Sequence, residues 1–366
     1  MRYRLITLLL LCAHTVLSQT PNVIIKNIKP AYEENKFPEI SYPANPKISE
    51  KINTALQLEY LEHLPGVFKK HPFENVCYVP DAGTNHMSFY EWKKLKSPKN
   101  VLSISIDGEA TGAYPEGFTN YHNFDLETGE PVYLTSLFTK AGQAQLLKKL
   151  NQKVKKTIQD FLKENNVQTN DKEEQERVSE QQSIYKECLG EVDGNSLKSY
   201  EFSPGRDSIT FIRYRCSNHA NRALDDLGEY YISYSYAQVK PYLSAYGKKA
   251  LLNENGPRNT TSPKGKMFKG KIAGKYPITA IISDIYSDGS LNMRYWYDKV
   301  KIPIELSGKF ANGHFTLVEN DYHSEEAQAW IAKANIEADW VDNKKIIGTW
   351  TNTKTNAVLK LELDTY

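Results

Sequence analysis

Long apolar runs are absent from the sequence after its first residues. No later stretch approaches the roughly 20 consecutive apolar residues that a membrane-spanning helix needs. The start of the chain differs, because a short basic segment and an apolar run from Leu5 to Cys12 precede Val16 and Ser18, where a signal peptidase reads. We therefore expect residues 1–18 to be a cleaved export signal, and the mature chain to be a soluble periplasmic or extracellular protein without a membrane span.

Cysteines are also few. Of the four in the chain, Cys12 lies in the expected signal, so Cys77, Cys188 and Cys216 remain. Exported thiols tend to oxidise, and three cysteines allow at most one intramolecular disulfide. We expect Cys188 to pair with Cys216, because both lie between a polar helical segment and a tyrosine-rich strand, and Cys77 to stay unpaired.

An excess of charge of one sign is missing too. The formal net charge is +2, and lysines are interspersed with acidic residues. Nucleic-acid-binding proteins instead concentrate Lys and Arg on one face or interleave them with aromatic residues. We therefore expect no nucleic-acid partner.

Familiar catalytic motifs are not found. The sequence has no G-x-S-x-G, H-E-x-x-H or C-x-x-C segment, so the common serine-hydrolase, zinc-protease and thioredoxin patterns do not apply. The histidines are scattered without the spacing of metal ligands. We expect no catalytic residue, no metal site and no cofactor.

The length of the chain suggests two domains. Residues 253–265 are rich in Asn, Gly, Pro, Ser and Thr and have no periodic apolar residue, which is typical of a linker. We therefore predict a first domain at residues 19–252 and a second at 266–366.

The first domain mixes helical and strand patterns. Apolar residues at helical spacing predict a helix over 45–66 and a second over 141–164, which a polar segment continues as a weaker helix or a mobile connection. Alternation with a period of two predicts strands at 101–107 and 229–237, each with one buried face. These elements favour an α+β domain with a mixed sheet and two long helices.

The sequence of the second domain predicts short strands at nearly regular spacing. Eight such segments follow the linker, and turn signals such as Asp288-Gly289, Asn312-Gly313 and Asp342-Asn343 separate them. Closing the sheet removes its unpaired edges. We therefore predict a small eight-stranded β-barrel.

One stretch of the first domain, "GAYPEGFTNYHNFDLETGEPVYL" at 112–134, is rich in glycine, aromatic and acidic residues. Its second half predicts a hairpin with Gly129 in the left-handed region. Aromatic residues close together in a loop can form a binding surface, or they can pack against the sheet. The candidate ligand-binding residues are Tyr114, Glu116, Phe118, Tyr121 and His122.

Several segments carry a family resemblance. "FPEISYP", "KINTAL", "VLSISID", the stretch at Gly112–Phe138 and "ISYSYAQVKPYLS" together resemble the extracytoplasmic domain shared by the lysozyme-sensing anti-sigma factor RsiV and PdaC-type peptidoglycan deacetylases. The resemblance covers Phe37–Leu243, although Tyr114 stands where the family usually has histidine. In the second domain, "GKYPI" and "GTW" are similar to small barrel domains of exported Bacteroidetes proteins.

The resemblance implies an envelope function. The sequence lacks the membrane span of RsiV-like sensors and the Asp-Asp and H-x-x-x-H motifs of the deacetylases. We therefore expect an exported, non-catalytic binding protein of the bacterial cell envelope that recognises a peptidoglycan-related glycan or a lysozyme-like protein. The alternatives are a hydrolase of envelope polysaccharide that uses acidic residues such as Glu116 and Asp125, and a structural envelope protein.

Overall fold

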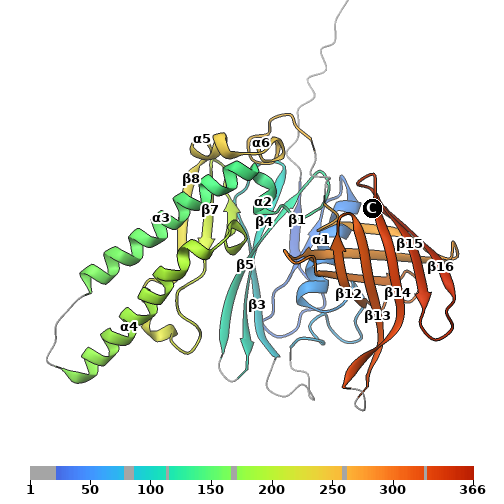
Figure 1. Ribbon diagram of the computed structural model, residues 1–366, viewed down its shortest axis with the longest axis horizontal. Coiled ribbons are helices and arrows are strands. Elements are labelled where there is room, and N and C mark those ends of the chain that lie inside the picture. Colours follow the sequence, from blue (N-terminus) through green and yellow to red (C-terminus); the bar gives the residue numbers. More distant parts are fainter. Residues whose placement is uncertain (1–21, 78–85, 113–114, 166–170, 258–261, 325–327) are drawn as a thin grey trace, which may run out of the picture.

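The computed structural model describes six stretches of the chain, which are residues 22–77, 86–112, 115–165, 171–257, 262–324 and 328–366. The expected signal and Tyr114 lie outside them. The described chain forms an assembly of helices and small sheets from β1 to α6, followed by a barrel of strands from β9 to β16 (Figure 1). The expected α+β class of the first part and the closed barrel of the second are confirmed.

The first layer contains one helix and two antiparallel sheets. Its elements are β1 (Ile24–Asn27), β2 (Pro38–Ser41), α1 (Pro46–Tyr60), β3 (His86–Lys94), β4 (Val101–Thr111) and β5 (Glu116–Asp125). Strand β1 pairs with β2, and the second sheet has the order β3-β4-β5. Helix α1 begins at Pro46, which has no N–H to leave unsatisfied. Its apolar stripe, with Ile52 and Leu56, is buried in one cluster with Ile104 of β4.

Strand β4 is covered on both faces, whereas its alternating sequence predicts one buried face. Ser103 and Ser105, expected on the open face, are buried. Ser103 Oγ donates to Asn123 Oδ1 at 2.6 Å, and Asn123 Nδ2 donates to the Phe202 carbonyl at 2.9 Å. A second layer of strands therefore covers this face, and hydrogen bonds satisfy its polar groups.

The second layer combines a helical hairpin with a third antiparallel sheet, β6-β7-β8. Its elements are α2 (Leu134–Leu137), α3 (Lys140–Glu164), α4 (Lys172–Glu191), η1 (Val192–Gly194), η2 (Leu197–Ser199), β6 (Glu201–Pro204), β7 (Ser208–Arg213), η3 (Arg222–Leu224), β8 (Tyr230–Ser235), α5 (Tyr236–Val239), η4 (Lys240–Tyr242) and α6 (Ala245–Leu252). Leu150 and Val154 on the predicted stripe of α3 are fully buried. The polar segment left open as a helix or a mobile connection forms α4, capped by Asp171, which accepts from Glu173 N.

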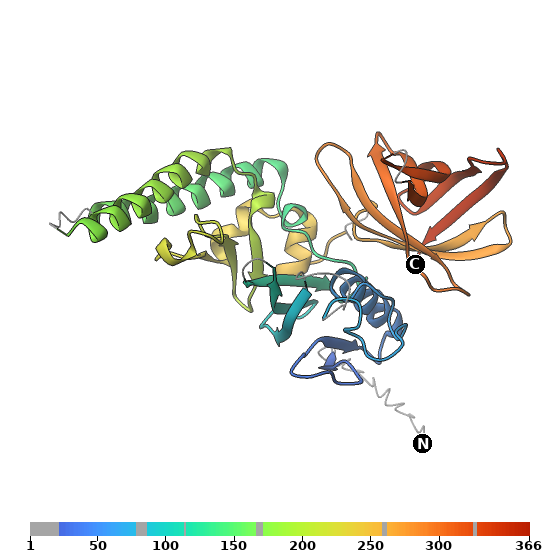
Figure 2. The same cartoon turned by 90° about the horizontal axis from the view of Figure 1, so that it is seen from below.

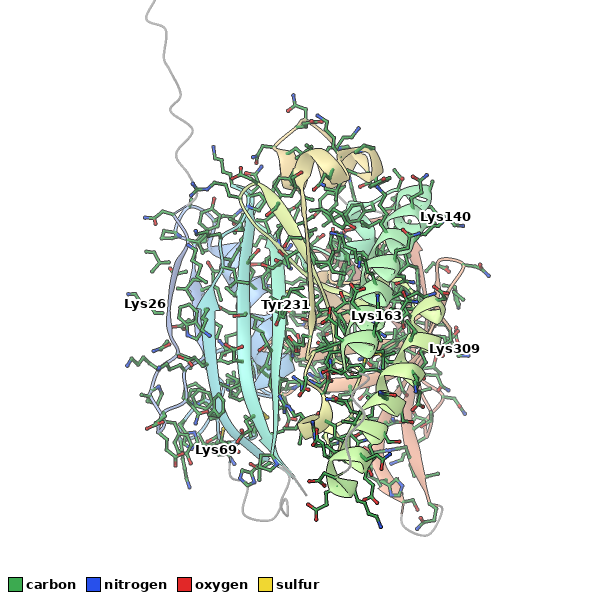
Figure 3. The ribbon with its side chains drawn as sticks, turned by 90° about the vertical axis from the view of Figure 1, so that its left-hand side faces the viewer. Lys26, Lys69, Lys140, Lys163, Tyr231 and Lys309 are labelled. Carbon is green, nitrogen blue, oxygen red and sulfur yellow. A yellow bond between two sulfur atoms is a disulfide. The ribbon has the colours of Figure 1, made fainter. Side chains whose placement is uncertain are left out.

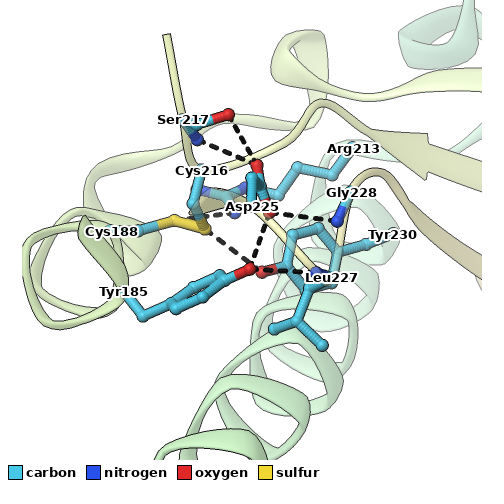
Figure 4. The surroundings of a disulfide bond; sticks show 9 residues. All are labelled: Tyr185, Cys188, Arg213, Cys216, Ser217, Asp225, Leu227, Gly228 and Tyr230. Carbon is cyan, nitrogen blue, oxygen red and sulfur yellow. Dashed lines mark hydrogen bonds between the residues drawn. A yellow bond between two sulfur atoms is a disulfide. The ribbon is translucent and has the colours of Figure 1, made fainter. Parts of the chain in front are cut away.

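A disulfide joins Cys188 of α4 to Cys216 after β7, the pairing that the sequence predicts, and Cys77 is a buried free thiol. Asp225 organises the surrounding loop (Figure 4), because it accepts hydrogen bonds from the Tyr185 hydroxyl at 2.7 Å and from Ser217. The bridge and this network together fix the segment between β7 and β8 onto α4.

The second part is a closed antiparallel barrel. Its strands are β9 (Met267–Ile272), β10 (Tyr276–Ile285), β11 (Leu291–Tyr297), β12 (Ile304–Ala311), β13 (His314–Ser324), β14 (Ala329–Val341), β15 (Lys345–Asn352) and β16 (Val358–Thr365). Neighbours in sequence pair throughout, and β16 pairs with β9 to close the ring. Gly289 and Gly313 take positive φ at two of the predicted turns.

The barrel interior is filled by side chains. Phe268, Phe315 and Ile336 are among its buried core residues, and the space left inside is only about 10 Å³. That volume barely holds one water molecule. Glu319 is the buried charge of this core, and its carboxylate accepts from the Tyr295 hydroxyl at 2.6 Å and pairs with Lys333. The barrel therefore has no internal ligand site of useful size.

The barrel lies against α1 of the first part, as Figure 2 shows. Leu58 and Leu64 form a small apolar cluster with Ile281 of β10 and Trp296 of β11. Beside it, Arg294 Nη1 donates to the Leu58 carbonyl at 2.8 Å. Apolar burial and a directed hydrogen bond thus fix the position of the barrel.

Two polar contacts extend this junction. Lys266 and Glu130 form a largely buried ion pair at 2.8 Å. Glu50 of α1 accepts from the Tyr366 hydroxyl at 2.5 Å and from Lys269 Nζ at 2.9 Å.

Among the described residues, no helix is both long enough and apolar enough to span a membrane.

Candidate functional site

A cavity of about 550 Å³ lies at the junction of the two parts. Helix α1, strands β5 and β6, the segment before α2, and β10 with the residues before β9 all contribute to its wall. The cavity lies beside the outer edge of β5, which pairs with no other described strand and bonds at its end to the segment around Pro131. Side-chain hydrogen bonds of Glu201 and Asn123 join β5 to β6, and β10 forms the facing wall of the cavity.

Glu201, the first residue of β6, is one of the two chemically distinctive groups of the cavity. Its Oε2 accepts from the Tyr121 backbone N–H at 3.2 Å, and its Oε1 accepts from the Tyr214 hydroxyl at 2.5 Å. Burial raises the pKa of this carboxyl, while the two hydrogen bonds act in the opposite direction. Two donors therefore orient this carboxyl group, and no described residue forms an ion pair with it.

Glu59 is the second such group. It lies in the last turn of α1, where the helix dipole disfavours a negative charge. Its side chain is exposed to the solvent of the cavity, although protein atoms lie close around it. This desolvation raises the pKa of Glu59 to about 7; nearby Arg294 lowers it, and the charge of Glu201 raises it further. Among the described residues, neither Glu59 nor Glu201 forms an ion pair.

The remaining charges of the wall are arranged differently. Lys264 Nζ pairs with Asp284 Oδ1 at 2.5 Å and lies 4.3 Å from the centre of the Tyr133 ring. Arg294 forms two hydrogen bonds with Glu305 on the outer surface of the barrel. Lys198 is exposed. Glu59 and Glu201 are thus the carboxylates of the cavity that lack a cationic partner.

Of the residues that the sequence singled out, Tyr121 and His122 line the cavity. The segment expected to be a loop is mostly strand β5, so neighbouring residues point to opposite faces of the sheet. Phe118 packs against Tyr60 with 6.4 Å between ring centres, and Glu116 is exposed at the start of the strand. The four described candidates therefore do not form one surface, Tyr114 lies outside the described residues, and the role of all five in binding stays a prediction.

His122 has a structural environment. Its Nε2 lies 2.6 Å from the Tyr60 hydroxyl, which in turn accepts from Asn120 Nδ2 at 2.7 Å. Burial lowers the pKa of His122 to about 4, so the ring is neutral at physiological pH. A neutral imidazole that accepts from Tyr60 helps to hold β5 on α1.

The acidic pair considered for a hydrolase is not close in space. Glu116 and Asp125 are the two end residues of the extended strand β5. At about 3.4 Å per residue they lie roughly 30 Å apart. Glycosidases hold their two carboxyl groups about 5 to 9.5 Å apart, so these two residues cannot act on one bond.

Beside the cavity, Tyr121, Glu201, Tyr214, Glu229 and Tyr231 form what we name the tyrosine–carboxylate surface. Tyr214 and Tyr231 are 46% and 57% exposed, and the Tyr231 hydroxyl donates to Glu229. Figure 3 views the molecule from the side away from the barrel and shows Tyr231 on the face toward the viewer. Side chains of β8 alternate between buried and exposed, which places Tyr231 on the solvent face. No sequence signal predicts that Tyr231 lies near Glu201 or Glu59.

Comparison with known proteins gives weak similarities. No protein-family model matches the sequence, and no curated protein matches it significantly. A solved DUF3298 family member from Bacteroides fragilis is 13% identical, with a TM-score of 0.38 over 64% of this chain and 99% of that chain. A DUF3298 family protein from Pseudomonas aeruginosa is 9% identical, with a TM-score of 0.32 over 61% of this chain and 94% of that one. Both belong to the kind of domain that the sequence resembles.

The described residues contain no group of three or more His, Cys, Asp or Glu side chains that could hold a metal ion. The carboxylates, amide groups and tyrosine rings of the lining offer hydrogen bonding, aromatic contact and negative charge.

Proposed function

We propose that the chain is an exported binding protein of the bacterial cell envelope, and that it holds a peptidoglycan-related glycan in the cavity between α1, β5, β6 and the barrel. The observation that carries the proposal is the cavity itself. Its volume of about 550 Å³ lies within the range of small-molecule sites. The disulfide is typical of exported proteins and supports that localisation.

The wall of the cavity suits a sugar. Carboxylates such as Glu59 and Glu201 accept hydrogen bonds from hydroxyl groups, and tyrosine rings such as Tyr121 and Tyr133 pack against the apolar faces of sugar rings. A purely apolar ligand would leave these polar groups unsatisfied at a cost. The cavity at the junction is much larger than the space inside the barrel, which side chains fill.

The test is a calorimetric titration of the purified protein with soluble peptidoglycan fragments and with N-acetylglucosamine oligomers. Changing Tyr121 to Ala should weaken binding by at least about 2 kcal/mol if this ring is an anchor. Tyr322→Ala removes an exposed tyrosine of β13 outside the cavity and serves as the matched control. Thermal melts of both variants separate a lost contact from an unfolded fraction. Absence of binding to every fragment would refute the proposal.

A lysozyme-like protein is the other ligand class to test. The tyrosine–carboxylate surface favours it, because exposed aromatic rings and unpaired carboxylates complement a basic protein. Tyr231→Ala should then weaken capture of lysozyme more than it weakens glycan binding. Unchanged capture of lysozyme by Tyr231→Ala would leave the glycan as the ligand.

A hydrolase of envelope polysaccharide is the second candidate function. The observation in its favour is that Glu59 and Glu201 share one cavity and have no cationic partner. Release of reducing ends from peptidoglycan by the wild type, and its loss in both Glu59→Gln and Glu201→Gln, would favour turnover. Binding without release of reducing ends would favour the binding protein.

A further inference from the structure

The charges around the cavity are not balanced. Lys264 is neutralised by Asp284, and Arg294, whose charge lowers the pKa of Glu59, bonds Glu305 and a backbone carbonyl outside the cavity. The carboxylates of Glu59 and Glu201 face the same space without an ion pair to any described residue. Lys198 at the wall is exposed and offsets one negative charge at most.

We propose that this cavity selects a glycan carrying a primary ammonium group, and that Glu59 and Glu201 bind that group together. The inference rests on the proposed glycan-binding function and names the charge of the ligand. A neutral sugar would satisfy the oxygen atoms of these carboxylates but would bring no positive charge to them.

Glu59 and Glu201 place two carboxyl groups in the wall of one cavity. Desolvation by nearby protein raises the pKa of both carboxyl groups, and the charge of Glu201 raises that of Glu59 further. An ammonium ion between them would compensate both charges and donate up to three hydrogen bonds. Such a charge-assisted contact is stronger than one to a neutral hydroxyl group.

The two residues differ in how firmly they are held. Tyr214 and the Tyr121 backbone fix Glu201, so its carboxylate is already oriented. Glu59 makes no hydrogen bond with a described residue, so its carboxylate is free to turn toward a ligand. The Tyr121 side chain adds an aromatic ring near the same wall, and an ammonium ion over a ring gains further attraction.

An ammonium group on an envelope glycan has two chemical sources. It belongs either to a hexosamine that lacks its acetyl group or to a diamino acid in the peptide attached to the glycan. The first arm of the experiment compares the glucosamine tetramer with the N-acetylglucosamine tetramer. The second arm compares a muropeptide that has a free side-chain amine with the same muropeptide after chemical acetylation.

Calorimetric titrations at neutral pH and about 0.15 M salt limit non-specific attraction between distant charges. In at least one arm, the amine form should bind at least tenfold more tightly than its acetylated partner. Glu59→Gln and Glu201→Gln should each remove most of this difference. The matched control Glu362→Gln, which removes an exposed carboxylate of β16, should preserve it.

The outcomes separate this inference from the function on which it rests. Equal binding of the amine and acetylated forms in both arms would overturn ammonium selection while leaving glycan binding intact. No binding of any form would refute both proposals. Because the wild-type comparison needs no variant, a folding defect in Glu201→Gln cannot hide the result.

Discussion

Removal of the Cys188–Cys216 disulfide should destabilise the protein by a predictable amount. The bridge joins residues separated by 28 positions, and it restricts the unfolded chain more than the folded one. In the chain-entropy model a loop of this length corresponds to about 12 cal/mol/K, which is about 3.6 kcal/mol at 25 °C. The double variant Cys188→Ala/Cys216→Ala should therefore lose about that much free energy of unfolding.

The folded state contributes smaller losses of the same sign. Arg213 Nη1 lies 3.5 Å from Cys188 Sγ, and the Tyr230 hydroxyl lies 3.1 Å from Cys216 Sγ. The hydrogen bonds of Asp225 do not involve either sulfur atom, so the loop should keep its conformation. We expect a folded but less stable protein.

Guanidinium denaturation at equilibrium measures this effect. The denaturant midpoint should fall in the double variant, and the m-value should rise because the unfolded chain becomes more expanded. Cys77→Ala, which removes the buried free thiol, is the control for losing a sulfur atom without opening a loop. A loss below about 1 kcal/mol in the double variant would refute the loop-closure argument.

Three further changes probe the core, the cavity and the junction. Leu150→Ala on α3 should cost about 2 to 5 kcal/mol, because its side chain is fully buried, and an unchanged thermal melt would show that the stripe is not core. The pKa of Glu59 is raised to about 7, so ionisation of this group lowers the stability of the wild type as pH rises from about 4.5 to 7. Glu59→Gln removes this loss. The melting temperature of the variant minus that of the wild type should therefore be larger at pH 8 than at pH 4. A constant difference would contradict the raised pKa. Trp296→Ala removes the largest ring of the apolar cluster with Leu58, and we expect calorimetry to resolve separate transitions for the two parts; a single cooperative transition would contradict that role.

The barrel could be predicted because its pattern is local. Each strand alternates over a few residues, and Asp-Gly or Asn-Gly pairs mark the turns, so short windows of sequence contain the signal. The same holds for α1 and α3, whose apolar stripes have helical spacing. Strand β4 differs, because Ser103 and Ser105 are small polar residues that predict an open face. Only long-range packing of β6 against β5 covers them.

The candidate site could not be predicted for a related reason. Glu59 lies in a helix, and Glu201 begins a short strand far along the chain, with no shared motif. The third wall, including Asp284, belongs to the barrel. Tyr121 was recognised because glycine and aromatic residues surround it in sequence, which marks composition rather than three-dimensional neighbours. A site assembled from three distant segments leaves little trace in any one of them.

The position of the barrel against the first part determines whether the cavity exists. The barrel interior has no room for a ligand, so its contribution to a site must come from its outer surface. Strand β10 provides both Ile281, which packs in the junction, and Asp284, which lines the cavity. A shift of β10 that breaks the apolar contact therefore also moves the cavity wall. Stability of the junction and affinity for a ligand are thus coupled, since a ligand that contacts both walls stabilises the docked arrangement by mass action.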